Sequence, residues 1–345
     1  MARRVLLPAG LCWLALSALA LAEGDKADAR PKDDPAAYTI SGPFTHDNLT
    51  IFLLHGKDTL SGKPLLTLQE ALEQKKAVVH ETAQVNELSV ENVSSDVEIY
   101  VQPGDIVKGG RQDRLIAFDL ILPPKSGKVP VASFCVEAGR WAKRGAEADA
   151  SFGSSANVAN SKDLKVAAQS GMRSQSQVWA KVRESQQKLA RNVGKGVENK
   201  ESPTSLQLTL EDKKLLEEVD RYVKELSKAV QGKKDVIGYA VAINGQVEAA
   251  DVFGSNALFL KLWPKLINGS ATEALAEKQK DKKFDAPTAE AVTAFLADAV
   301  KGKKSEKEVS KRVKQVCQED DKTLYLEARD RANKDAVIHR SYLKK

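Results

Sequence analysis

The sequence predicts an α+β fold, with an antiparallel β-sandwich or partial barrel in the N-terminal half. Helices, a hairpin with an Asn-Gly turn and a C-terminal helical or hairpin region are expected to follow. Four short β-rich runs lie between residues 86 and 137, separated by clusters of serine, proline, glycine and lysine, as is typical of antiparallel sheets. Helical periodicity replaces them after about residue 175, and Asn244-Gly245 then separates two extended runs.

The first 22 residues resemble a signal peptide. A start with two arginines precedes the apolar run VLLPAGLCWLALSALALA, and Ala20-Leu21-Ala22 provides a cleavage site. The run is about 18 residues long, which is short for a membrane span, although an uncleaved anchor is the alternative. Cys12 lacks the small preceding residue of a lipid-attachment site. We therefore expect export to the periplasm or the extracellular space, without lipidation or stable membrane insertion after cleavage.

The composition of the remaining residues predicts how the chain is divided into segments. Residues 23–37 are charged and aperiodic and predict a flexible spacer; residues 38–345 predict one α+β domain, β-rich over 38–150 and mixed over 151–345. The leader carries two of the 53 basic residues and no acid, so 51 basic residues face 47 acidic ones after cleavage. This small excess, with lysines mixed among acids in 277–283 and 301–308, argues against a nucleic-acid partner.

The β-rich half begins with a buried strand at 50–56 and a helix at 66–77. Thr67 is a suitable N-cap and Glu70, three residues later, completes a capping box. An extended run follows at 78–83. The runs NELSVENV, DVEIYVQPGD, DRLIAFDLILPP and KVPVASFCVE then predict four successive strands.

Helices dominate the second half. Apolar residues recur at helical spacing over 178–193 and 211–230, and in the latter Thr209 can cap the start and Gly232 the end. A hairpin is predicted over 236–253, then a helix interrupted or bent near Pro264, and another over 288–300. Residues 303–318 are ambiguous between helix and strand, and 323–343 predict two extended segments around the polar turn RANKD.

The stretch FCVEAGRW, residues 134–141, contains the main candidate site. In VPVASFCVE, alternation places Cys135 and Glu137 on one face at the strand end. Arg114 begins a strongly apolar face in DRLIAFDLIL, and a guanidinium there needs a carboxylate partner. One interpretation is a structural pair between Glu137 and Arg114 or Arg140, covered by Trp141. The other is a pocket in which an arginine grips an anion, Trp141 offers an aromatic face and Glu137 orients the ligand or acts as general acid or base.

Neighbouring features are compatible with either interpretation. Gly109-Gly110, before Gln112, can approach an anion or simply form a turn, and Arg173 precedes a helix that could face the pocket. The four histidines at 46, 55, 80 and 339 show no metal-ligand spacing, so neither a metal nor a cofactor is expected. Cys135 and Cys317 could form a disulfide in an exported protein, or remain buried thiols.

Several of these motifs resemble one known family. LTLQEAL, ELSVENV, QPGDIVKGGRQDR, VPVASFCVEAGRW, QSQVWAKV and DVFGSNALFLKLWPKLI are similar to the ARG and rhodanese-phosphatase superfamily associated protein domain, over about residues 65–276. The CVExGRW element is the most specific match. The family commonly has Gln-Asn-Arg where this chain has Gln112-Asp113-Arg114. The resemblance implies a link to ADP-ribose or nucleotide-like metabolites, through the predicted association of the family with ADP-ribosyl glycohydrolases and phosphatases.

We therefore expect an exported binding or accessory module for an anionic small molecule or a partner segment. The alternatives are a hydrolase of nucleotide-type or sugar-phosphate substrates that uses Glu137, or a purely structural envelope protein. The sequence leaves the oligomeric state open. The candidate ligand-binding residues are Gln112, Arg114, Cys135, Glu137, Arg140, Trp141 and Arg173.

Overall fold

The computed structural model describes Met1 and residues 38–345 except positions 61, 63, 83, 143–150, 160, 172 and 173. The chain divides into residues 1–34 and residues 35–345, and all helices and strands below belong to the second unit. Apart from Met1, the expected signal peptide and spacer lie outside the described residues. Within the described part, no helix is long and apolar enough to cross a membrane.

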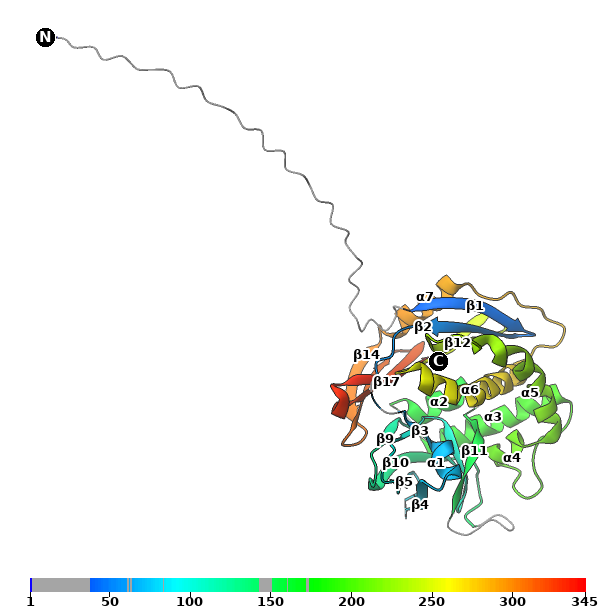
Figure 1. The fold of residues 1–345 in the computed structure, drawn as a ribbon. Helices are drawn as coiled ribbons and strands as arrows, with labels where there is room; N and C mark the ends of the chain where they lie inside the picture. The colour runs from blue at the N-terminus through cyan, green and yellow to red at the C-terminus, as the bar shows by residue number, and fades with distance from the viewer. Residues whose placement is uncertain are drawn as a thin grey trace. The chain divides into compact units, whose positions relative to one another are not determined.

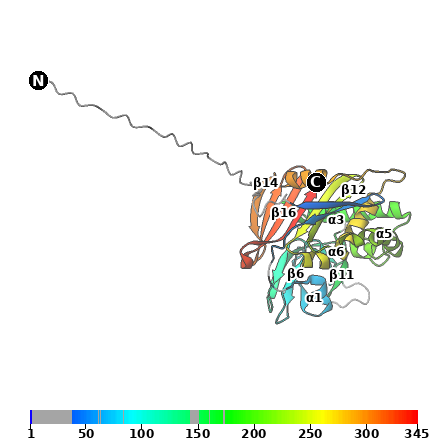
Figure 2. The same ribbon diagram turned by 45° about the horizontal axis from the view of Figure 1, so that its top comes forward.

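An eight-stranded antiparallel sheet unites strands from both ends of the chain. Blue N-terminal strands and orange to red C-terminal strands flank the central hairpin (Figures 1 and 2). In spatial order the strands are β1 (Thr39–His46), β2 (Leu49–His55), β12 (Val236–Ile243), β13 (Gln246–Phe253), β17 (Ala336–Lys344), β16 (Thr323–Asp330), β15 (Val313–Glu319) and β14 (Lys303–Glu308).

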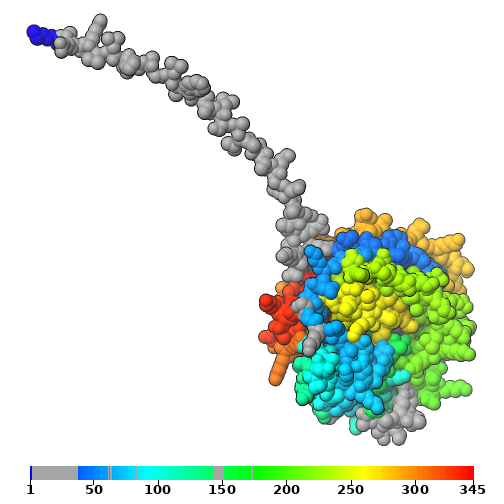
Figure 3. Space-filling view, viewed as in Figure 1, coloured from blue at the N-terminus to red at the C-terminus, as the bar shows by residue number. Residues whose placement is uncertain are grey.

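Helices cover both faces of this sheet, which explains why β2 and β12 are largely apolar and buried along nearly their whole length. Ile51 and Leu53 share a core with apolar residues of α5 (Lys213–Leu226) and α6 (Asn256–Ala276). The alternate side chains Phe52 and Leu54 pack with α7 (Ala289–Ala299) on the opposite face. On the surface, the green and yellow middle of the chain packs directly against the blue strands (Figure 3).

The N-terminal half forms two smaller sheets and a half-barrel. The six-stranded sheet runs β11 (Phe152–Val158), β7 (Asp105–Gly109), β8 (Arg114–Ile116), β10 (Gly127–Cys135), β5 (Glu87–Asn92) and β4 (Ala77–Glu81). The three-stranded sheet runs β3 (Leu66–Thr67), β6 (Ile99–Val101) and β9 (Leu120–Leu122). The α+β prediction is thus confirmed. The run DRLIAFDLIL is not one strand, however, because Ala117, Phe118 and Asp119 separate β8 from β9 and the two strands enter different sheets.

Local signals account for most helix boundaries. Thr67 and Glu70 form the expected capping box, although α1 spans only Leu68–Glu73. The 211–230 prediction placed the cap wrongly: α5 is capped by Asp212, which accepts from the Leu215 backbone N–H, while Thr209 belongs to the preceding short helix. Pro264 does not interrupt α6. The remaining helices are α2 (Lys162–Gln169), α3 (Gln175–Val193) and α4 (Leu206–Leu210), with 3₁₀ turns η1 (Ser227–Val230) and η2 (Arg331–Asn333).

The predicted hairpin over residues 236–253 is confirmed as β12 and β13. Asn244 and Gly245 both have positive φ, 52° and 77°, as a type I′ turn requires. The ambiguous 303–318 segment becomes the antiparallel pair β14 and β15. The charged composition of β14 is consistent with its place at the sheet edge, where it discourages pairing with another chain.

Candidate functional site

The end of β10 places Glu137 in the protein interior beside Arg140. The Arg140 Nε atom lies 2.7 Å from Glu137 Oε1, and the Ser202 hydroxyl donates to the same oxygen. The Glu137 side chain is 0% exposed and that of Arg140 is 10% exposed. The expected pair between Glu137 and Arg140 therefore exists, and solvent barely reaches it.

Asp113 extends this pair into a buried cluster. Its Oδ1 accepts from the Gly109 backbone N–H at 3.0 Å, and its Oδ2 accepts from the Ser205 hydroxyl at 3.1 Å. Arg140 Nη2 lies 3.8 Å from Asp113 Oδ1. We call Asp113, Glu137, Arg140, Ser202 and Ser205 the strand-end cluster. It joins two strands of the six-stranded sheet to the start of α4.

The chemistry of the strand-end cluster favours a structural role. Burial opposes ionisation of Glu137, but the Arg140 guanidinium and the Ser202 hydroxyl outweigh burial and lower the pKa of this carboxyl below its usual value. An ionised carboxylate already engaged by these groups is poorly suited to donate a proton to a substrate. Gln112 also makes a structural contact, because its side-chain amide donates to the Glu137 backbone carbonyl at 2.8 Å.

Arg114 belongs to a different contact. It lies opposite Cys135 in the register of β8 and β10, and its Nη2 is 3.5 Å from Glu81 Oε2 rather than beside Glu137. Its side chain is fully buried, and its Nε makes no hydrogen bond within the described part of the chain. The Arg114 guanidinium carbon lies 5.5 Å from the centre of the Trp141 ring. Trp141 therefore covers Arg114 and not the Glu137–Arg140 pair.

The remaining predicted ligand-binding residues do not belong to the strand-end cluster. Trp141 is 48% exposed, and Arg111 lies 5.8 Å from its ring centre. Arg173 lies outside the described residues. Gln175, at the start of α3, holds the end of β10 by exchanging hydrogen bonds of 2.8 Å with the backbone N–H and carbonyl of Cys135.

Of the two alternatives for the cysteines, a disulfide or two thiols, the structure has the thiols, because Cys135 and Cys317 are both free. Cys135 lies in β10 of the six-stranded sheet and Cys317 in β15 of the eight-stranded sheet. Burial raises the pKa of the Cys135 thiol to about 11, although the neighbouring Arg114 charge opposes this. Such a thiol is a weak nucleophile at neutral pH.

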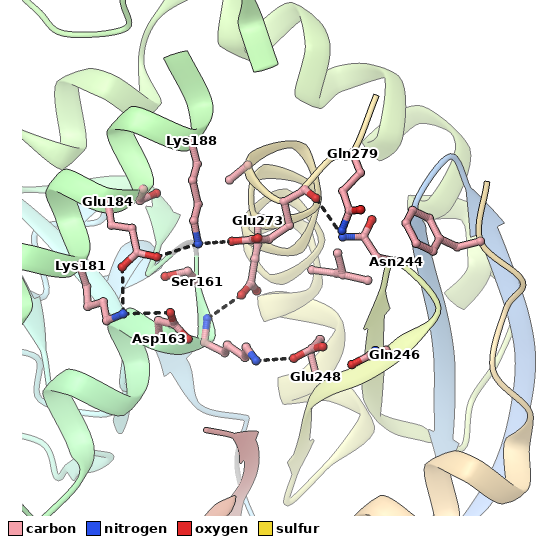
Figure 4. Close-up of a pocket in the computed structure, with 16 residues that line it drawn as sticks. Ser161, Asp163, Lys181, Glu184, Lys188, Asn244, Gln246, Glu248, Glu273 and Gln279 are labelled. Carbon is pink, nitrogen blue, oxygen red and sulfur yellow. Dashed lines mark hydrogen bonds and ion pairs between the residues drawn. The ribbon is translucent and has the colours of Figure 1, made fainter. Parts of the chain in front are cut away.

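A cavity of about 370 Å³ lies between α2, α3, α6 and the β12–β13 hairpin (Figure 4). We call it the polar cavity. Its size is within the range of small-molecule sites. Exposed Gln246 and Gln279 stand at its rim, and Phe284 contributes an aromatic wall.

Ion pairs organise the lining of the polar cavity. Lys181 contacts Asp163 at 3.2 Å and Glu184 at 2.9 Å, and Lys188 bridges Glu184 and Glu277 at 2.8 and 2.7 Å. Lys162 contacts Glu248 through its ammonium group. Among the described residues, the lining thus contains three lysines and five carboxyl groups, those of Asp163, Glu184, Glu248, Glu273 and Glu277.

Glu273 differs from the other carboxyl groups of the polar cavity. Its Oε1 accepts from the backbone N–H of Lys162 at 2.9 Å, and this is its one hydrogen bond in the described structure. Burial raises the pKa of Glu273 to about 7; the Glu248 charge adds to this effect, and the Lys162 N–H and the Lys165 charge oppose it. This carboxyl group can therefore exchange a proton near neutral pH.

A second cavity, of about 520 Å³, lies near the start of α6 and the end of β16. Arg312 on its wall contacts Asp330 at 2.9 Å through Nε and Glu98 at 3.2 Å through Nη2. This clamp ties the eight-stranded sheet to the residues before β6. Because these contacts give Arg312 a structural role, we do not assign this cavity as the functional site.

A third buried set of charges joins the sheets in the core. His339 of β17 lies between two carboxylates, with Nδ1 3.1 Å from Asp119 and Nε2 3.2 Å from Asp251. The Tyr100 hydroxyl donates to Asp119 at 2.6 Å, and Lys165 contacts Asp251 at 3.2 Å. The His339 ring also stacks on Phe253 at 4.6 Å between ring centres. No sequence spacing indicated this network, because its members come from five distant segments.

Part of the polar cavity could have been found from the sequence. Lys181, Glu184 and Lys188 have the three- and four-residue spacing that places side chains on one helix face. Glu273 is an acid within the otherwise weakly polar segment SATEALA, which is a signal of a buried charge. Their meeting with Lys162 and Glu248 depends on helix packing and was not predictable.

The comparison with protein families bears on the whole domain. The model of the ARG and Rhodanese-Phosphatase-superfamily-associated Protein domain matches residues 37–343. The chain belongs to this family. The match includes the CVExGRW element and extends the resemblance to nearly the entire second unit. No curated protein and no solved structure matches the sequence significantly. The family's description assigns no activity, so the function of this member must be argued from its own residues.

Proposed function

We propose that this family member is a binding module and that its ligand occupies the polar cavity. The observation that carries the proposal is the cavity itself: about 370 Å³ of space lined by charged and amide side chains from four elements. Small-molecule sites combine such a volume with a few positioned polar groups. The strand-end cluster offers no comparable room to Glu137, whose side chain is fully buried. We infer that this cluster holds the fold together.

The charge of the polar cavity modifies the expected ligand class. A nucleotide-like anion such as ADP-ribose would meet five carboxyl groups and only three lysines, each of which already contacts a carboxylate. An uncharged polyhydroxylated ligand or a cation fits this lining better than an anion. Phe284 can pack against the apolar face of such a molecule.

A hydrolase remains the second candidate function. The supporting observation is the Glu273 carboxyl group, whose pKa is about 7 and which lines the same cavity as Glu248. A carboxyl group with a raised pKa near a second carboxyl group is a common acid–base arrangement. Catalysis would then depend on Glu273 and not on Glu137.

Blocking the cavity mouth tests the binding proposal. Thermal-shift screening of ribose, glucose, glucosamine, putrescine, AMP and ADP-ribose is expected to identify a compound that raises Tm. At a ligand concentration of 100 times Kd, the expected stabilisation is about 2.7 kcal/mol. Gln279→Trp fills the exposed rim and should abolish the shift, whereas Gln231→Trp, at an exposed position outside the cavity, should preserve it.

Two results would contradict the proposal. One is a screen in which no compound raises the Tm of the unmodified protein. The other is a ligand shift that Gln279→Trp leaves intact, which would place the ligand elsewhere. Analysis of the products formed from any hit distinguishes binding from hydrolysis.

We also propose that the chain is exported, on the basis of its charged start, apolar run and Ala20-Leu21-Ala22 site. Expression of the full sequence in a bacterial host followed by fractionation should recover a protein outside the cytoplasm that begins at Glu23. Amino-terminal sequencing provides the measurement. A cytoplasmic product that retains Met1 would contradict export.

A further inference from the structure

We propose that the ligand of the polar cavity carries a protonated amine, and that this ammonium group binds directly to the Glu273 carboxylate with release of the proton that Glu273 holds. This inference rests on the proposed function and deepens it by naming the ligand chemistry and the contacting residue. Three features of the site support it: the cavity lining, the unequal use of its carboxyl groups and a smaller cavity beside Glu273.

Glu273 differs from the other carboxyl groups of the lining because it forms no ion pair with a lysine of the described residues. The ammonium groups of Lys162, Lys181 and Lys188 contact other carboxylates, as described above. Lys165, on the inner side, contacts Asp251. Within the described residues no lysine contacts Glu273, whose single hydrogen bond comes from a backbone N–H. Glu273 therefore retains acceptor capacity toward the cavity, which a ligand ammonium group can use.

A smaller cavity of about 20 Å³ also borders Glu273. Lys165, Tyr239 and Ser270 line it together with Glu273. This volume accommodates about one water molecule, and the polar lining supplies the partners such a water needs. Glu273 thus borders both the ligand space and this smaller cavity.

The surroundings of Glu273 determine the sign of the pH effect. Burial keeps the carboxyl group partly protonated near neutral pH, and a nearby ammonium group stabilises its ionised form. Tyr239 does not release a proton near neutral pH, because burial raises its pKa to about 12. The titratable groups that face Glu273 are Lys162 and Lys165 of α2, Glu184 and Lys188 of α3, Tyr239 of β12, Glu248 of β13 and Glu277 of α6.

Linked protonation gives quantitative expectations. Putrescine, whose amines stay protonated between pH 6 and 8, should on binding release about 0.9 proton at pH 6, about 0.5 at pH 7 and about 0.1 at pH 8, as expected for a Glu273 pKa of about 7. The apparent affinity should be about tenfold higher at pH 8 than at pH 6, because less of Glu273 must be deprotonated first. A neutral hydroxyl compound of the same shape should show neither effect.

Calorimetric titration of the full chain in buffers of different ionisation enthalpy measures this proton release. Glucosamine and glucose form a matched pair of probes, and putrescine is a second amine. Putrescine is expected to bind with proton release throughout the range from pH 6 to 8, and glucosamine at pH 6, where its own amine is protonated. Glucose is expected to bind at least tenfold more weakly than glucosamine at pH 6. Glu273→Gln should remove both the proton release and the pH dependence. Glu91→Gln is the matched control, because Glu91 is a partly buried carboxyl group that pairs with His80 outside the polar cavity.

The outcomes separate this inference from the proposed function. Binding of glucose or ADP-ribose in the cavity without amine preference would overturn the amine inference and leave the binding function standing. Amine binding without proton release, or with release that persists in Glu273→Gln, would also overturn it. If neither amine binds the unmodified protein at 20 mM, the amine inference is rejected whatever else binds. A difference in the pH dependence of Tm between Glu273→Gln and the unmodified protein, over pH 6 to 8, verifies that the variant folds and that Glu273 titrates there.

Discussion

Arg140→Ala is expected to lower the free energy of unfolding by about 3–5 kcal/mol, the usual consequence of removing one member of a buried ion pair. The substitution would leave the buried Glu137 carboxylate, with Asp113 nearby, without the guanidinium that offsets their charge. The Ser202 and Ser205 hydroxyls are neutral and cannot replace it. Urea denaturation followed by far-UV circular dichroism measures the change.

Arg221→Ala provides the control for this experiment. Arg221 pairs with Glu218 on the surface of α5 and its side chain is 68% exposed. Exposed pairs contribute about 0–1 kcal/mol, so the control should change stability little. An Arg140→Ala variant as stable as the Arg221→Ala variant, but defective in ligand binding, would refute the structural role of the strand-end cluster.

The second large effect concerns His339, whose charge should make the protein sensitive to alkaline pH. Burial disfavours the imidazolium, but the Asp119 and Asp251 carboxylates outweigh burial and raise the pKa of His339 to about 9 from an ordinary value of 6.5. Because the folded-state pKa is the higher one, the stabilisation is complete below about pH 6.5 and is lost as pH rises through 9. The full loss amounts to about 3 kcal/mol.

Denaturation curves at intervals between pH 6 and 9.5 measure this loss. His339→Gln should remove the alkaline slope, and it should be less stable than the unmodified protein at pH 7, because Asp119 and Asp251 would remain buried without a cation between them. His80→Gln is a suitable control, since the His80–Glu91 pair is partly exposed. An unmodified protein of constant stability across this range, or an alkaline slope that persists in His339→Gln, would contradict the imidazolium assignment.

Elements defined by local signals were the most predictable from the sequence. The Asn244-Gly245 turn and the Thr67–Glu70 capping box depend on residues close together in the chain, and both appear in the structure. The β-rich first half and the helical middle were also correct. Failures occurred where tertiary packing decides: residues 117–119 divide one apolar run between two sheets, and Asp212 rather than Thr209 caps α5.

The candidate site shows the same limit. The sequence predicted Glu137 at a strand end; it lies two residues after β10, and the short Gly139 turn allows Arg140 to reach it. The same parity could not reveal that Arg114 faces Glu81, since that contact joins β8 to the end of β4 across the sheet. The polar cavity requires α2, α3, α6 and β13 to converge, and their order along the sequence does not specify this arrangement.

The most direct test of the central claim compares two tryptophan substitutions in one ligand-binding assay. The central claim is that the ligand occupies the polar cavity and not the surface beside Trp141 and Arg114. For a compound that raises the Tm of the unmodified protein, Gln279→Trp should abolish the shift, whereas Trp141→Ala should retain it. A shift that survives Gln279→Trp and disappears in Trp141→Ala would contradict the account and place the ligand beside Trp141 and Arg114.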